Sequence, residues 1–119
     1  GYYLNPTVFD GANNKMKIAQ EEIFGPVLTT IPFKDVDDVI RQGNDTIYGL
    51  ASAVWTKDLK KAHQVARALK AGTVWVNTYN QFDCTAPFGG YKQSGYGREL
   101  GKDALDLYTQ VKSVWINLQ

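Results

Sequence analysis

Between residues 27 and 77 the apolar residues change their spacing from that of strands to that of helices and back again. Short apolar or β-branched runs are typical of strands, whereas apolar residues three and four apart are typical of an amphipathic helix. The strand-like runs are Val27–Phe33, Leu50–Trp55 and Thr73–Asn77, and a further short strand is predicted at Thr7–Phe9. Because helical connections favour parallel pairing, the sequence predicts an α/β fold with a small, mostly parallel sheet flanked by helices.

Local signals place the ends of the two helices between these strands. Asp35 is predicted to cap the first helix and Gly43 to end it. Either Thr56 or Asp58 is predicted to cap the second helix, which Gly72 closes. The apolar inner face of this second helix is expected to comprise Leu59, Ala62, Val65, Ala66 and Leu69.

The alternation stops after Asn77, where residues 78–97 form a long stretch rich in glycine and aromatic residues. A loop of this length in a compact domain is usually functional or disordered, and the aromatic content argues against disorder. A third helix is predicted over Arg98–Tyr108 and an alternating apolar strand over Val111–Leu118. An unpaired strand of this kind is prone to aggregate, so we expect it to protrude and pair with another subunit.

Charge and cysteine content limit which binding partners and which cellular compartment are expected. The formal net charge is +1, with acidic and basic residues interspersed, which gives no support for nucleic acid or an anionic membrane as partner. No apolar run approaches the ~20 residues needed to span a bilayer. Cys84 is the only cysteine and cannot form an intrachain disulfide, so the expected compartment is the cytoplasm.

Four motifs follow one another in order along the chain. They are Glu21–Val27, Asn44 with Tyr48–Ala51, Gly72–Asn77, and Pro87–Gly95 continuing into Gly97–Glu99. With these motifs the chain resembles the aldehyde dehydrogenase superfamily, over the whole length from Gly1 to Gln119. One such motif is a weak signal, but four in sequence, each in its expected structural setting, are a specific one.

The resemblance implies a parent enzyme that oxidises aldehydes to carboxylic acids with NAD or NADP. It implies that residues 1–110 match the later half of the catalytic domain and that residues 111–119 match the oligomerisation strand. The nucleophilic cysteine and the glutamate base would lie upstream, so no catalytic residue is expected in this chain, which should be inactive alone. The implied partners are a small aldehyde, the remainder of the same enzyme, and identical subunits in a homodimer or homotetramer.

Four residues are the candidate site residues that the resemblance implies. Glu22 would accept hydrogen bonds from the nicotinamide ribose hydroxyls, and Phe24 would pack beside the nicotinamide ring. Phe82 and Phe88 would line the aldehyde tunnel. The structural alternatives are a surface carboxylate that caps a turn for Glu22, a core aromatic for Phe24, and side chains that merely pin the loop for Phe82 and Phe88.

Other reactive or charged side chains favour structural explanations. Cys84 lacks a neighbouring histidine and is interpreted as non-nucleophilic, and His63 is expected on a solvated helix face. One histidine and one cysteine do not make a usual zinc site, so no metal is expected. Lys92 and Arg98 are expected to form ion pairs that fix the loop, and the glycines around them are interpreted as conformational.

A second hypothesis belongs to another class. The chain begins Gly1-Tyr2-Tyr3 without an initiator methionine, which we interpret as part of a longer polypeptide. Alternatively, it is a free-standing, non-catalytic α/β module that associates through its C-terminal strand. Both hypotheses share a fold, so the reading frame upstream of Gly1 distinguishes them.

Overall fold

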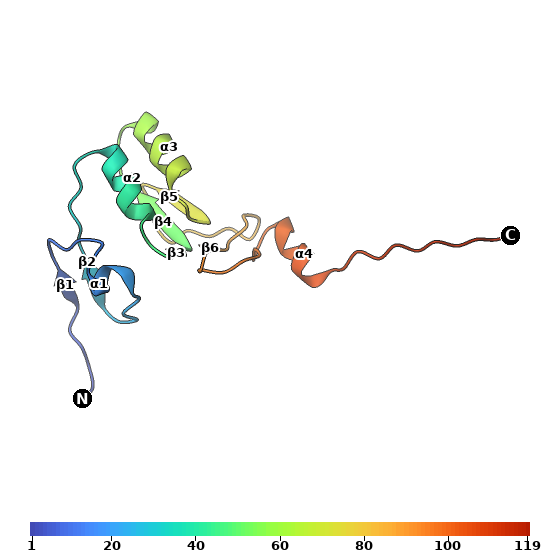
Figure 1. Ribbon diagram of the computed structural model, residues 1–119, viewed down its shortest axis with the longest axis horizontal. Coiled ribbons are helices and arrows are strands. Elements are labelled where there is room, and N and C mark those ends of the chain that lie inside the picture. The colour runs from blue at the N-terminus through green and yellow to red at the C-terminus, as the bar shows by residue number, and fades with distance from the viewer.

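The computed structural model describes residues 1–119, and its first part is a small βαβ unit (Figure 1). Strand β1 (Thr7–Phe9) pairs in parallel with β2 (Val27–Thr29), and the short helix α1 (Lys17–Gln20) lies between them in the sequence. The strand predicted at Thr7–Phe9 is therefore confirmed. The second predicted strand begins at Val27 as expected but ends earlier, at Thr29.

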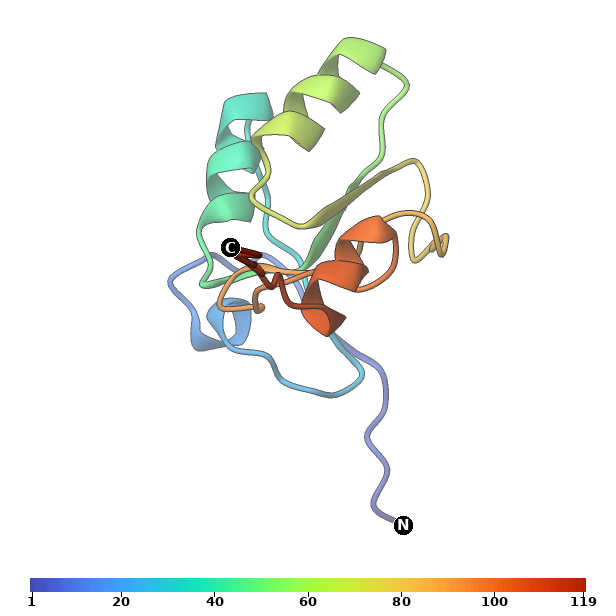
Figure 2. The same cartoon turned by 90° about the vertical axis from the view of Figure 1, so that its right-hand side faces the viewer.

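The second unit places two helices beside a parallel strand pair. Strands β4 (Ala51–Val54) and β5 (Thr73–Val76) pair in parallel, with Ala53 opposite Trp75. Helices α2 (Val36–Asn44) and α3 (Leu59–Ala68) lie side by side in both views, and α3 packs against both strands (Figure 2). The predicted α/β class and the parallel pairing are confirmed.

The strands form three separate two-stranded sheets. The third is an antiparallel pair of β3 (Tyr48–Gly49) with β6 (Tyr91–Lys92), which returns the glycine-rich loop to the second unit. The predicted small, mostly parallel sheet is divided into separate strand pairs, because β2 pairs back with β1 and not with β4. In each parallel pair, both strands consequently have one edge without a hydrogen-bonded neighbour.

Both helix caps follow the sequence signals. The Asp35 carboxylate accepts a hydrogen bond from the Asp38 N–H (2.8 Å), and Asp58 accepts one from the Lys61 N–H (3.1 Å). Of the two residues predicted for the second cap, Asp58 is the one used. These bonds satisfy N–H groups that the first turn of a helix leaves without a partner.

The predicted end of α2 at Gly43 was wrong by one residue, because the helix continues to Asn44. The Asn44 amide group donates to the Ala68 carbonyl (2.9 Å), and its oxygen accepts from the Lys70 N–H (2.7 Å). The side chain thus ties the end of α2 to the end of α3. Gly43 serves close packing instead, since a Cβ there would lie 3.1 Å from the Leu69 side chain.

The predicted helix over Arg98–Tyr108 is shorter than expected. A 3₁₀ turn at Lys102–Ala104 runs into α4 (Leu105–Tyr108). Leu100 and Gly101 have φ of 60° and 58°, which no right-handed helix accommodates. The backbone before them is extended and pairs with the loop. The helical spacing of apolar residues in the sequence therefore predicts a longer helix than the structure contains.

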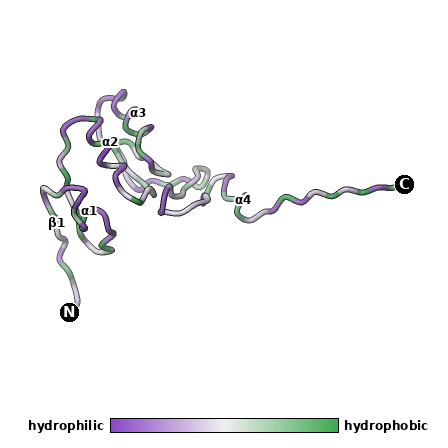
Figure 3. The backbone as a smooth tube through the Cα atoms, viewed as in Figure 1, coloured by the Kyte–Doolittle hydropathy of each residue, from purple (hydrophilic) through white to green (hydrophobic).

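The last residues form an extended tail that points away from the rest of the molecule (Figure 1). Residues 111–119 are exposed and have no ladder partner in the chain, so the predicted strand is not formed here. Hydrophobic and hydrophilic residues alternate along the tail (Figure 3). This alternation is the pattern of a strand with two different faces, and its pairing with another subunit stays a prediction.

The core is small for a chain of this mass. The buried hydrophobic residues are Ala12, Ala62, Val65 and Trp75. The accessible surface is 10207 Å², whereas a compact monomer of this mass exposes about 6,500 Å². The radius of gyration is 19.6 Å, against about 13.5 Å for a compact domain of this length. None of the helices combines the length and the apolar character needed to cross a membrane.

Candidate functional site

Four aromatic side chains form a continuous cluster between β5 and the long loop. Trp75 meets Tyr79 and Phe82 edge to face, with ring centroids 5.3 and 5.6 Å apart. Phe82 meets Phe88 in the same manner at 5.0 Å. Edge-to-face contacts at these distances are favourable beyond the area that they bury. The structure therefore brings together the two predicted substrate residues, Phe82 and Phe88.

Backbone contacts fix Phe88 from the opposite side of the loop. Its N–H donates to the Glu99 carbonyl and its carbonyl accepts from the Glu99 N–H, both at 2.7 Å. The next residue, Gly89, touches Gly72 so closely that a Cβ on Gly72 would lie 1.6 Å from the Gly89 carbonyl oxygen. Only glycine fits at position 72, immediately before β5. Phe88 is thus held in place by its backbone as well as by its ring.

Lys92 and Arg98 do not form the predicted ion pairs. The Lys92 ammonium donates to the Asn44 and Thr46 carbonyls, both at 2.9 Å. Arg98 donates to the Gly90 and Gly97 carbonyls at 3.1 and 2.7 Å. The physical reason is local, because the C-terminus of α2 and the turns of the loop present carbonyls without helical partners. Both cations fix the loop as expected, but by binding backbone oxygens.

Glu22 and Phe24 lie on the segment that joins α1 to β2. The Glu22 carboxylate is exposed and makes no hydrogen bond or ion pair, whereas neighbouring Glu21 lies 3.5 Å from the Lys17 ammonium. Phe24 is 92% exposed and has a φ of 56°. The core alternative for Phe24 is therefore wrong for this structure, whereas Glu22 is the surface carboxylate of its structural alternative but caps no turn. Both side chains are free to contact a partner.

The two predicted halves of the site do not share a cleft within this chain. Neither Glu22 nor Phe24 lines the pocket that contains Phe88. Phe88 lines a pocket of about 220 Å³ together with Tyr96, Arg98 and other residues of the loop. A complete cavity between the cofactor and substrate candidates would consequently need walls from further polypeptide.

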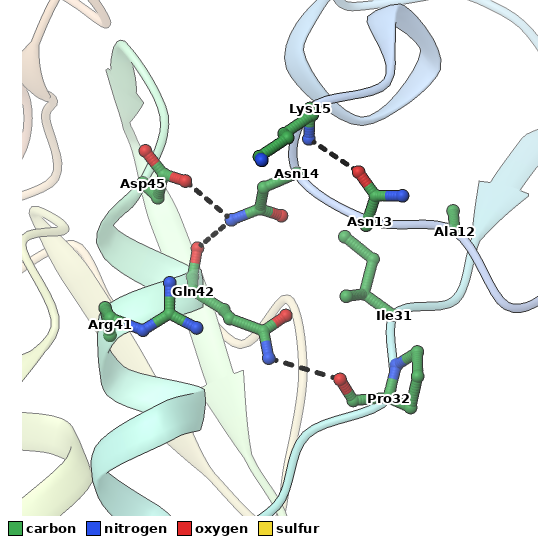
Figure 4. Close-up of a pocket in the computed structure, with 9 residues that line it drawn as sticks. All are labelled: Ala12, Asn13, Asn14, Lys15, Ile31, Pro32, Arg41, Gln42 and Asp45. Carbon is green, nitrogen blue, oxygen red and sulfur yellow. Dashed lines mark hydrogen bonds between the residues drawn. The ribbon is translucent and has the colours of Figure 1, made fainter.

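Another pocket, lined mostly by polar residues, lies between the first unit and α2 (Figure 4). Its polar groups bind one another. The Asn14 amide donates to the Gln42 carbonyl (2.8 Å) and to the Asp45 carboxylate (3.3 Å), and the Gln42 side chain donates to the Pro32 carbonyl (3.1 Å). Arg41 is paired with Asp38. These hydrogen bonds make the pocket a polar joint between the two units.

The remaining reactive residues lie apart from one another. His63 is on the exposed side of α3, which confirms the expected solvated helix face, and Cys84 is exposed in the loop. The Thr85 hydroxyl and N–H both donate to the Asp83 carboxylate, at 2.6 and 2.8 Å, and these bonds lower the pKa of Asp83. No three His, Cys, Asp or Glu side chains gather closely enough to hold a metal ion.

Sequence reasoning missed two members of the cluster, Tyr79 and the central Trp75. The strand of Trp75 was predicted, but only the structure shows its indole N–H donating to the Gln81 carbonyl at 2.9 Å. The available signal was a large aromatic in the middle of a predicted strand that leads directly into an aromatic-rich loop. An α/β unit that presents an aromatic wall beside a strand end is typical of a small-molecule-binding domain.

The family of the chain follows from comparison with known proteins. Residues 1–114 match the aldehyde dehydrogenase family, and the chain belongs to that family. It is 55% identical, over 99% of its length, to the Saccharomyces cerevisiae protein named aldehyde dehydrogenase NAD(P)+ 1, of which it covers 23%. It is 54% identical, over 98% of its length, to the betaine aldehyde dehydrogenase of Bacillus subtilis, of which it covers 24%.

Solved structures agree with this family. An indole-3-acetaldehyde dehydrogenase in complex with NAD+ is 60% identical and superposes with a TM-score of 0.91, over 98% of this chain and 23% of that one. The betaine aldehyde dehydrogenase of Staphylococcus aureus in complex with NAD+ is 51% identical, with a TM-score of 0.88 over 91% of this chain and 22% of that one. The chain therefore spans about a quarter of the length of the relatives that it matches.

Proposed function

We propose that this chain serves in an NAD(P)-dependent aldehyde dehydrogenase that oxidises aldehydes to carboxylic acids. Residues 1–110 would be the later half of its catalytic domain. The observation that carries the proposal is the match of residues 1–114 to the aldehyde dehydrogenase family, together with the aromatic wall of Phe82 and Phe88. The exposed surface, far larger than that of a compact monomer, supports a chain that packs against further polypeptide. It argues against the alternative, a free-standing module.

In this proposal the chain binds and orients but does not supply the reacting groups. The nucleophilic cysteine and the general base would come from the remainder of the enzyme, and NAD(P)+ would accept the hydride when it is bound. Cys84 would not be the nucleophile, because it lies exposed in the loop and has no histidine beside it in the sequence. The chain alone would accordingly be inactive.

Glu22 and Phe24 would contact the cofactor. The Glu22 carboxylate is exposed and unpartnered, so it is available to accept hydrogen bonds from the two vicinal hydroxyls of a ribose. The Phe24 ring projects from a backbone in the left-handed region, which costs a bulky residue free energy and is typical of sites where orientation matters. NAD and NADP both fit this proposal, because neither residue would contact the 2′ position of the adenosine ribose.

Phe82 and Phe88 would form one wall of the aldehyde pocket. Apolar aromatic lining with few polar groups suits the carbon chain of an aldehyde and leaves the carbonyl to groups elsewhere. The substrate class would be broad, covering aliphatic, aromatic or betaine-type aldehydes. The names of the relatives, which include betaine aldehyde and indole-3-acetaldehyde dehydrogenases, support this range.

The assembly would be a homodimer or homotetramer in the cytoplasm. The tail at residues 111–119 is extended, alternating and unpaired, which supports its pairing with the sheet of another subunit. The single, unpaired cysteine supports a reducing compartment.

The test of this function uses the Glu22→Gln variant of the full-length enzyme in single-turnover kinetics. The amide keeps the size of the side chain but accepts more weakly than a carboxylate, so hydride transfer should slow about tenfold, as expected for loss of a charge-assisted hydrogen bond. Acylation of the nucleophile by aldehyde should change less. The matched control is Glu21→Gln, since the neighbouring carboxylate is paired with Lys17. Unaltered hydride transfer in Glu22→Gln would remove the assigned role.

A further inference from the structure

The aromatic cluster begins at a buried tryptophan and continues through a ring that is largely exposed. Trp75, in the middle of β5, is 8% exposed and is the largest side chain among the buried residues. Phe82 is 52% exposed, and Phe88 lies at the far end of the cluster, half-buried. Of these three rings Phe82, in the middle, is therefore the most exposed, and it lies between the buried indole and the half-buried Phe88 ring. Of the three residues, only Trp75 lies in a helix or strand.

Trp75 holds the loop through two different contacts. The indole and the Phe82 ring pack edge to face with an interplanar angle of 88°. The indole N–H donates to the Gln81 carbonyl, the residue directly before Phe82. One side chain on a strand thus fixes both the backbone and the ring at the start of the loop segment that carries Phe82.

The position of the Phe82 ring affects the contact that the Phe88 ring makes. The two rings meet edge to face with an interplanar angle of 86°, so a shift of one ring removes the contact of the other. The backbone of Phe88 is held by Glu99 and cannot follow such a shift. A change at Trp75 would therefore alter the angle between the two rings while leaving the backbone of Phe88 in place.

We propose that Trp75 is a positioning residue that sets the shape of the aldehyde pocket by fixing Phe82 against Phe88, and so tunes the preference for aldehydes with a flat apolar group. The inference rests on the proposed function, because it needs Phe82 and Phe88 to contact the aldehyde. Trp75 itself touches neither substrate nor cofactor. It acts because a wall of loop residues discriminates between substrates only when its rings are held by a rigid element.

The test compares two aldehydes in the full-length enzyme. Phenylacetaldehyde presents a flat ring to the wall, and acetaldehyde presents one methyl group. Trp75→Leu should raise KM for phenylacetaldehyde about fivefold, which is the size expected for losing one aromatic pair. KM for acetaldehyde and kcat for both aldehydes should change much less. Trp75→Phe should restore part of the preference, because it keeps an aromatic edge but has no N–H for Gln81.

The matched control is Trp55→Leu, at another tryptophan, which lies just after β4 and is largely exposed. It should leave the ratio of the two KM values unchanged. In a double-mutant cycle, the increase in KM for phenylacetaldehyde caused by Trp75→Leu and Phe82→Leu together should be smaller than the product of the two single increases. If Trp75→Leu does not fold, the cycle with Trp75→Phe provides the same comparison.

Equal effects of Trp75 variants on both aldehydes, or a strictly multiplicative cycle, would overturn the inference while leaving the proposed function intact. A wild-type enzyme that oxidises neither aldehyde nor any other would overturn the proposed function instead. In that case hydrogen exchange still decides whether Trp75 positions the loop. Exchange in the segment from Gln81 to Ala86 should accelerate in Trp75→Phe, and unchanged exchange would contradict the positioning role.

Discussion

Single residues determine how the loop reaches the strands. The contact of Gly72 with the Gly89 carbonyl leaves no space for a methyl group, and φ at position 72 lies outside the left-handed region. Space, and not backbone conformation, therefore explains this glycine. The same position links β5 to the loop that bears Phe88, so a substitution there affects both.

Gly72→Ala should destabilise the full-length enzyme by about 3 kcal/mol or more, because a backbone carbonyl would have to move to admit the Cβ. Differential scanning calorimetry would detect it as a lower thermal midpoint, with a shorter half-life if unfolding is irreversible. Gly25→Ala is the matched control, since a Cβ there meets nothing closer than 4.0 Å. Equal midpoints for the two variants would contradict the close approach.

At the scale of elements, α2 shows how local charge supports a helix. The Asp38 carboxylate accepts from the Lys34 N–H (3.0 Å) and from Arg41 (2.5 Å), and also from Gln42 (2.9 Å). These bonds, with the Lys34 bond the largest cause, hold the pKa of Asp38 below its ordinary value of 3.8. A carboxylate on the first turn also interacts favourably with the helix dipole.

The lowered pKa gives the stability of α2 a defined dependence on pH. The folded form binds the proton less tightly than the unfolded form, so the contribution of Asp38 is complete above 3.8 and is lost as the pH falls through the lowered folded pKa. In a plot of thermal midpoint against pH, Asp38→Asn should reduce the fall of the midpoint at acid pH. Asp37→Asn, at an exposed neighbour without a hydrogen bond, should retain it. Parallel curves for Asp38→Asn and the wild type would exclude this source of acid sensitivity.

Elements whose signals are local were predicted well from the sequence. The caps at Asp35 and Asp58, the parallel pairing and the strands around Trp75 depend on spacing that a few neighbouring residues define. The long helix from Arg98 was predicted wrongly and the division of the strands into separate pairs was not predicted, because strand neighbours and the positive φ of Leu100 depend on contacts between distant segments. The aromatic cluster was predicted only in part. Phe82 and Phe88 followed from a family resemblance, whereas their support by Trp75 needed coordinates.

At the scale of the whole molecule, the chain exposes about 3,700 Å² more than a compact monomer of its mass would. A folded protein rarely leaves so many large apolar side chains in water, and only a small core opposes the entropy of unfolding. The isolated 119-residue chain should therefore bind a hydrophobic dye such as ANS strongly. By isothermal titration calorimetry it should not bind NAD+ tightly, because Glu22 and Phe24 would be only part of the cofactor site. Tight binding would favour the free-standing module.

The tail leads to a prediction about assembly. Deletion of residues 111–119 from the full-length enzyme should reduce the number of subunits in the assembly, because the proposed strand pairing between subunits would be lost. Light scattering would detect this change as a lower molecular mass. Substitution of the exposed Lys112 by glutamine, which retains the backbone donors and acceptors, serves as the control. A full-length enzyme that is monodisperse as a monomer before any deletion would count against the pairing.

The three tryptophans lie in three different surroundings. The Trp75 indole is enclosed beside two other rings, whereas Trp55 lies at the end of β4 and Trp115 projects from the tail. Indole emission shifts to shorter wavelength as water is excluded, so the enclosed ring should emit at the blue edge of the spectrum and the other two at the red edge. The protein thus carries its own optical probes: a quencher dissolved in water should dim the red component first and leave a signal from the aromatic wall.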